Sequence, residues 1–252
     1  MADRHCGMRL PLGLRLAIFL RSFLLQSVWN PQGMQHVGFC FALLPVASRK
    51  SDEERRAFAK RHLEFFNSNP VLASYVLGAS AAAELTADDA QCIEVVHLKR
   101  SLVGPLGMAG DALFWGALRP LAGLAAVLVA IGGGLWAPLL FLAVYNVPHL
   151  ALRWRGLGRG AERGPGAARE LLGPVYRSTV RRLRLSVAFL AGLTATAAVG
   201  LGQGATTPRA AVALVFLAAG FIGARVHIPA SLLGTAGVLC GLILALTGTI
   251  GG

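Results

Sequence analysis

The chain of 252 residues is 55% hydrophobic and only 14% charged, a balance that excludes an ordinary soluble domain and predicts a polytopic membrane protein. Its 24 basic residues outnumber the 12 acidic ones, which gives a formal net charge of +12. From Leu171 onward there is no Asp or Glu, and the arginines stand at the borders of apolar runs, as on the cytoplasmic flanks of membrane spans. This distribution excludes a nucleic-acid-binding module, which needs a soluble basic face with interleaved aromatic residues.

The first 25 residues predict an amphipathic segment at the membrane surface. Arg15 and Arg21 interrupt the apolar patch 10–25, and no small-residue cleavage site follows it. We therefore expect a retained segment rather than a signal peptide.

Two short apolar runs follow, at 37–47 and 71–83. Both are shorter than the roughly 20 residues that a helix needs to cross a bilayer, so we expect half-helices of the discontinuous or re-entrant kind found in transporters. A charged helix over 49–61 separates the two runs. Ser51 and Glu54 have the spacing of a capping box and predict where this helix begins. Its many charges predict exposure to water on the cytoplasmic side.

A polar segment, 62–70, lies between the charged helix and the second apolar run, and it contains Asn67, Asn69 and Pro70. Amide side chains both donate and accept hydrogen bonds, which suits a neutral sugar, and the neighbouring phenylalanines could cover the apolar faces of that sugar. The alternative is an Asn-Ser-Asn-Pro turn with ordinary helix caps. The spacing alone favours the turn.

The stretch 99–120 is the most unusual part of the sequence, because it is largely apolar yet contains Pro105, four glycines from 102 to 118, and Asp111. Proline and glycine disfavour a helix interior, so we expect a broken or re-entrant segment, preceded by a short exposed helix over 84–100. An acid in apolar surroundings indicates a functional site. Asp111 is also a favoured residue for capping a half-helix that begins at Ala112, and capping does not exclude lining a site.

In the second half, the apolar segment 121–147 contains Gly132–Gly134 and Pro138, which predict either a break in one span or two short helices. Nine arginines and only two glutamates lie between 153 and 184, and we expect an arginine-rich cytoplasmic loop over 157–184. Three further apolar segments predict C-terminal transmembrane helices, at about 185–202, 209–224 and 229–250.

The four cysteines are scattered without a Cys-x-x-Cys pair, so we expect neither a metal site nor a disulfide framework, and no cofactor. No catalytic group is indicated by the spacing of any residues.

Several motifs together resemble the IID component of mannose-family phosphotransferase systems, in matching order from about residue 18 to 156. They are Phe19–Phe23, Gln26, Trp29–Asn30, Met34–Gln35, Gly38–Phe39, Arg61–Asn67, Asn69–Pro70, Lys99, Gly104–Leu106, Gly110–Asp111, Phe114–Gly116, Asn146, Arg153 and Gly156.

This resemblance implies an all-α integral membrane protein, a polytopic helical bundle with discontinuous or re-entrant helices in its N-terminal half and an elevator-like motion. It implies a hetero-oligomer with a IIC membrane subunit that carries a hexose across the bacterial inner membrane, while cytoplasmic IIA and IIB phosphorylate the sugar. The IID chain itself would carry no phosphohistidine, so His62 would be structural. The implied organisation is an N-terminal segment, a motif-bearing membrane core, the arginine-rich loop and C-terminal helices, at 1–25, 26–156, 157–184 and 185–252.

The resemblance also suggests site residues by motif position. Lys99 would pair with a carboxylate or face the side where IIB docks, and Gly104, Pro105 and Gly110 would shape the broken segment. The side chains expected to line the sugar path are polar or acidic: Gln26, Asn30, Gln35, Asn67, Asn69 and Asp111.

The chain departs from the family pattern in several motifs, including the central one, where Met108 replaces a usual glycine and Arg100 and Ser101 replace smaller residues. The sequence from Trp29 to Gln35 lacks one acid and one base that the family usually has there, and the usual pair of acids is reduced to Glu84 followed by Leu85. The alternative function is therefore a regulatory or degenerate subunit that binds partners of the phosphotransferase system without transporting sugar.

Overall fold

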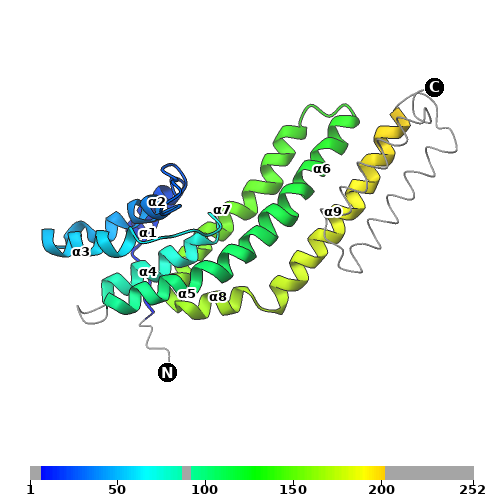
Figure 1. The fold of residues 1–252 in the computed structure, drawn as a ribbon. Coiled ribbons are helices and arrows are strands. Elements are labelled where there is room, and N and C mark those ends of the chain that lie inside the picture. The colour runs from blue at the N-terminus through cyan, green and yellow to red at the C-terminus, as the bar shows by residue number, and fades with distance from the viewer. Residues whose placement is uncertain (1–6, 87–91, 202–252) are drawn as a thin grey trace. The chain divides into compact units, whose positions relative to one another are not determined.

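The structure is a computed structural model that describes residues 7–86 and 92–201. These residues are mostly helical (Figure 1), and within them the only β pairing is a pair of isolated bridges, Asn30 with Met34 and Met34 with Phe66. The elements are α1 (Leu12–Ser22), α2 (His36–Leu43), the 3-10 helix η1 (Leu44–Arg49), α3 (Asp52–His62), α4 (Ala73–Thr86), α5 (Cys92–Gly110), the π-helix η3 (Asp111–Leu118), α6 (Arg119–Ile131), α7 (Ala137–Arg163), α8 (Pro165–Leu171) and α9 (Pro174–Leu201).

The described residues divide into two compact units. The first contains 7–86, 92–114 and 146–177, and the second contains 115–145 and 178–201. The helices α7 and α9 and the π-helix η3 each contribute to both units.

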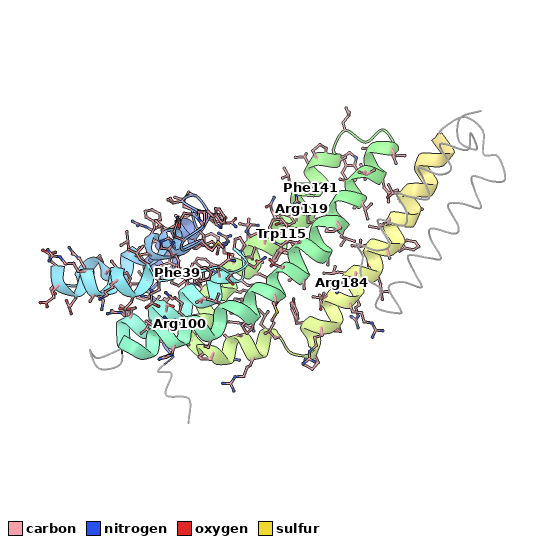
Figure 2. All side chains as sticks on the ribbon, in the orientation of Figure 1. Phe39, Arg100, Trp115, Arg119, Phe141 and Arg184 are labelled. Carbon is pink, nitrogen blue, oxygen red and sulfur yellow. The ribbon has the colours of Figure 1, made fainter. Side chains whose placement is uncertain are left out.

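The first unit has a continuous apolar core. Phe39 of α2, whose side chain is labelled in Figure 2, is fully buried in it. The helices α4 and α7 approach closely because glycines face the partner backbone: a Cβ on Gly78 would overlap the Leu157 carbonyl, and one on Gly160 would overlap the Tyr75 carbonyl. This close packing fixes the position of α4, and α4 begins directly after the polar segment 62–70.

The second unit exposes large apolar side chains along its helices: Val127, Leu135, Trp136, Leu139, Leu142 and Phe189. A soluble protein rarely exposes so many large apolar groups together, whereas helices that face lipid do. The Arg119 guanidinium lies 5.1 Å from the centroid of the Trp115 ring, and both residues are labelled in Figure 2.

The predicted start of the charged helix is confirmed. Ser51 is the N-cap of α3, its hydroxyl accepts from the Glu54 amide at 3.3 Å, and the Glu54 carboxylate accepts from the Ser51 amide at 2.6 Å. The two apolar runs that flank this helix form short helices, α2 with η1 and then α4, as expected.

The central segment corrects the prediction of a break at 99–120. The chain is helical without interruption from Cys92 to Ile131, and Val95–Ile131 is the one helix of the described residues long and apolar enough to cross a membrane. Pro105 is exposed, while Leu102 and Leu106, one turn apart on one face of α5, are buried in the core. Packing of that face outweighs the low helix propensity of proline and glycine.

Asp111 does not cap a new helix, so that expectation is also wrong. It is the first residue of the π-helix η3, and α5 enters η3 directly. The predicted interruption near Gly132–Gly134 is confirmed: α6 ends at Ile131, Gly133 has a φ of +79°, and α7 begins at Ala137.

The arginine-rich loop expected over 157–184 is helical, in the end of α7, all of α8 and the start of α9. Gly156 and Gly160 lie within α7 and do not interrupt it. They face α4, where larger residues would not fit. Gly164, with a φ of +50°, makes the turn into α8. The expected segment 185–202 falls in α9, whereas 209–224 and 229–250 lie outside the described residues.

Candidate functional site

Two loops of the first unit lie side by side: residues 23–35, between α1 and α2, and the polar segment 62–70. The backbone amide of Gln35 donates to the Phe66 carbonyl at 2.8 Å, and the backbone amide of Phe66 donates to the Gly33 carbonyl at 3.2 Å. Met34, between these contacts, has a φ of +58°, which is uncommon for a residue other than glycine. The Phe66 ring stacks on the Phe39 ring, with centroids 4.1 Å apart, so Phe66 serves the core rather than a ligand.

Gln35 links the two loops by its side chain as well. The side chain is buried, and its Oε1 accepts from the backbone amide of Ser68 at 3.1 Å. The Ser68 hydroxyl donates to the Val103 carbonyl of α5 at 3.1 Å. The polar segment is therefore attached to α2 on one side and to α5 on the other.

Asn69 makes the central contact of the site. Its Oδ1 accepts from the amides of Val71 and Leu72, at 3.0 and 3.4 Å, which is the turn that the spacing favoured. Its Nδ2 donates to Oδ1 of Asp111 at 3.0 Å. One buried amide thus closes the turn before α4 and holds the exposed acid at the start of η3.

Gly110 makes this approach possible, because a Cβ at this position would overlap the side chain of Asn69. Gly107, one turn earlier on α5, faces Ser68, with 3.6 Å between an added Cβ and the Ser68 hydroxyl oxygen. Gly107 and Gly110 lie on the same face of α5, and because they have no side chains they leave room for the polar segment 62–70. Gly104 has open space beside it and Pro105 is exposed, so neither contributes to this contact.

The remaining residues expected to line a sugar path are not in this hydrogen-bonded group. The Asn30 Oδ1 accepts from the Gly33 amide at 3.0 Å and closes its own turn. Gln26 and Asn67 are exposed on the two loops. Lys99 is buried, and its ammonium donates to the Arg61 carbonyl at 2.9 Å, so its observed partner is backbone at the end of α3.

The sequence analysis missed a buried ion cluster around Glu84. The Glu84 carboxylate accepts from Nε and an Nη of Arg61, each at 3.0 Å, from Nε2 of His62 at 3.0 Å, and lies 3.4 Å from Nζ of Lys50. This cluster joins α4 to the end of α3, directly before the polar segment. The signal was the single acid in an otherwise apolar helix, since a buried charge needs a partner.

The cluster shifts the titration of both its acid and its histidine. Burial alone would raise the pKa of Glu84, but the hydrogen bonds from His62 and Arg61 and the charge of Arg61 outweigh it and lower this pKa to about 2. Burial lowers the pKa of His62, and the hydrogen bond to Glu84 opposes this shift only in part. We conclude that Glu84 is ionised and that His62 is neutral, with its proton on Nε2 donated in a hydrogen bond to the Glu84 carboxylate.

Fold and site together define an all-α membrane protein with a polar site at a π-helix. Residues 14–203 match the model of one protein family, which is described as "PTS system mannose/fructose/sorbose family IID component". The chain belongs to this family, which confirms the resemblance in its motifs.

Relatives and solved structures agree with this assignment. The mannose-specific EIID component of Escherichia coli K12 is 36% identical over 162 residues, which are 62% of this chain and 57% of the relative. The sorbose-specific EIID component of Klebsiella pneumoniae is 31% identical over 188 residues, 72% of this chain and 68% of the relative. The chain thus matches little more than half the length of the Escherichia coli protein.

Two solved structures share the fold. One, described only as a membrane protein, has a TM-score of 0.69 at 24% identity, and the match covers 96% of this chain and 97% of the other. The other is a chain from the cryo-EM structure of the mannose transporter ManYZ in complex with microcin E492. That chain has a TM-score of 0.58 at 25% identity, with the same coverage of both chains.

Proposed function

We propose that this chain is the IID subunit of a mannose-type permease in the bacterial inner membrane, where it forms a hetero-oligomer with a IIC subunit and carries a hexose inward for phosphorylation by IIB. Family membership supports this proposal, as do the names of the relatives, which are specific for mannose and sorbose. The fold shared with a chain of the mannose transporter ManYZ supports the membrane partner.

The hydrogen bond from Asn69 to Asp111 is the observation that carries the proposal for the site. A carboxylate accepts hydrogen bonds from sugar hydroxyls, and the buried Asn69 amide orients this carboxylate by donating to its Oδ1. Asp111 is exposed while Asn69 and Gln35 are buried, so the acid is held by a fixed frame and still accessible to a ligand. Pre-organised polar groups of this kind bind with less loss of conformational entropy.

His62 does not act as a phosphoryl carrier in this proposal. The side chain is buried and its Nε2 is bonded to Glu84, which supports a structural role. The phosphoryl group would come from the cytoplasmic IIA and IIB proteins. The exposed arginines near the start of α9, including Arg184 in Figure 2, support a cytoplasmic position for that end of the helix.

Uptake of labelled hexoses tests the proposal, in a bacterial strain without its own mannose-type permease. We expect phosphorylated hexose to accumulate when this chain is expressed with the IIC, IIA and IIB proteins of its own organism, and not when this chain alone is omitted. Equal accumulation with and without the chain would contradict the proposal and favour a regulatory subunit.

A further inference from the structure

Tyr176, near the start of α9, makes an unusual contact with α5. Its hydroxyl donates to the backbone carbonyl of Ala109 at 2.5 Å. The tyrosine ring is partly buried against the apolar core of the first unit, which includes Leu106 and Ala109. The contact therefore joins two segments of the same compact unit that are 67 residues apart.

The carbonyl that Tyr176 contacts lies where the helix changes its hydrogen-bond register. Ala109 lies two residues before Asp111, which is the first residue of η3. An α-helical carbonyl accepts from the amide four residues on, and a π-helical carbonyl accepts from the amide five residues on. Where one register gives way to the other, the regular backbone pairing is disturbed. A side-chain donor at this level stabilises the junction and fixes the residue at which it occurs.

Three consecutive residues connect this junction to the site. Ala109 contacts Tyr176, Gly110 packs against the side chain of Asn69, and Asp111 accepts from Asn69. A shift of the junction by one residue would rotate Asp111 around the helix axis, because a π-helix turns less per residue than an α-helix. Such a rotation would carry its carboxylate away from Asn69.

We propose that Tyr176 is a positioning residue for the sugar site, which directs the Asp111 carboxylate by holding the Ala109 carbonyl at the start of the π-helix. This inference rests on the proposed function, in which Asp111 contacts the sugar. Tyr176 itself does not touch the sugar. It acts through the backbone of α5, so its contribution depends on the presence of the Asp111 carboxylate.

A double-mutant cycle on sugar affinity tests this dependence. The purified complex with the IIC subunit is compared with its Tyr176→Phe, Asp111→Asn and doubly substituted forms, by the Kd for the transported hexose. We expect Tyr176→Phe to weaken binding about fivefold with little change in thermal midpoint, as one lost hydrogen bond of about 1 kcal/mol would do. In the Asp111→Asn background the same substitution should have almost no effect.

One further variant serves as a control. Tyr145→Phe removes a tyrosine hydroxyl from α7, where the ring stacks on Phe141, and should bind sugar as the unsubstituted complex does.

The outcomes separate this inference from the proposed function. Unchanged affinity of Tyr176→Phe, or the same fivefold loss in the Asp111→Asn background, would overturn the positioning role while leaving Asp111 in the site. Unchanged affinity of Asp111→Asn would instead remove Asp111 from the sugar path, and the role of Tyr176 would fall with it.

Discussion

The side chain of Asn69 donates to the Asp111 carboxylate across 3.0 Å, although the two residues are 42 positions apart. This hydrogen bond joins the loop before α4 to the first residue of the π-helix. Asn69 is held by its turn, and the helix fixes the backbone of Asp111. The pair therefore defines the geometry that a bound sugar would meet.

The substitution Asn69→Asp tests the polarity of this pair. The new carboxylate can still accept from the amides of the turn, but it cannot donate to Asp111, and two carboxylates at this distance repel each other unless one binds a proton. We expect hexose uptake by this variant to be weak at pH 7.5 and to recover in part at pH 5.5, whereas uptake by the unsubstituted complex should not show this recovery. A pH profile of uptake parallel to that of the unsubstituted complex would contradict the pairing.

Glycine substitutions on α5 test the close approach of the loop. Gly110→Ala should lower the free energy of unfolding by about 1–3 kcal/mol, because its Cβ would overlap Asn69, and it should weaken sugar binding. Gly104→Ala is the matched control on the same helix, since the space beside Gly104 is open. It should leave stability unchanged or raise it by up to about 1 kcal/mol. Thermal unfolding in detergent measures both, and an equal response of the two variants would be inconsistent with the loop position.

Glu84 is expected to stabilise the first unit strongly. Replacing it with glutamine leaves Arg61 and Lys50 without their buried counter-charge, and breaking a buried ion pair in this way costs about 3–5 kcal/mol. Glu53→Gln, on the exposed face of α3, should change stability by less than about 0.5 kcal/mol. Chemical unfolding of the two variants measures this difference in the free energy of unfolding. Similar midpoints would show that the ion cluster around Glu84 contributes little to the stability of the first unit.

The same acid predicts a pH dependence of stability. The pKa of Glu84 is about 2 in the folded protein against an ordinary 4.5, so the unfolded chain binds this proton first as the medium becomes acidic. Its contribution, about 3 kcal/mol, is present above pH 4.5 and is lost as the pH falls from there towards 2. Between pH 5.5 and 3 the thermal midpoint of the unsubstituted protein should fall more steeply than that of Glu84→Gln, which has no such proton to bind. Parallel curves would contradict the lowered pKa.

Local signals in the sequence predicted local structure well. The capping box of Ser51 and Glu54 and the glycines at 132–134 act on neighbouring residues, and both predictions are confirmed. The family motifs suggested Asn69, Gln35 and Asp111 as site residues; in the structure Asn69 contacts Asp111, and Gln35 contacts Ser68 beside Asn69, while their role in sugar binding stays a prediction.

The failures have a common physical cause, which is tertiary packing. Pro105 and its neighbouring glycines predicted a break, yet burial of Leu102 and Leu106 keeps α5 helical. The arginines between 153 and 184 suggested a loop, yet Gly156 and Gly160 admit α4 against a continuous α7. The partners of Glu84 are Arg61 and His62 of α3 and Lys50, which directly follows η1. No rule of sequence spacing connects these residues to Glu84. Each of these features depends on residues that are distant in the sequence.

The affinity of the complex for hexose after Asp111→Asn tests the account most directly. A hydrogen bond to a charged group contributes about 1.5–3 kcal/mol, so loss of the carboxylate should weaken sugar binding by at least about tenfold. The matched control is Asp52→Asn, which removes an exposed acid of α3 that pairs with Arg55 at 3.4 Å, and it should bind sugar normally. A folded, IIC-bound Asp111→Asn complex with undiminished affinity for hexose would contradict the account.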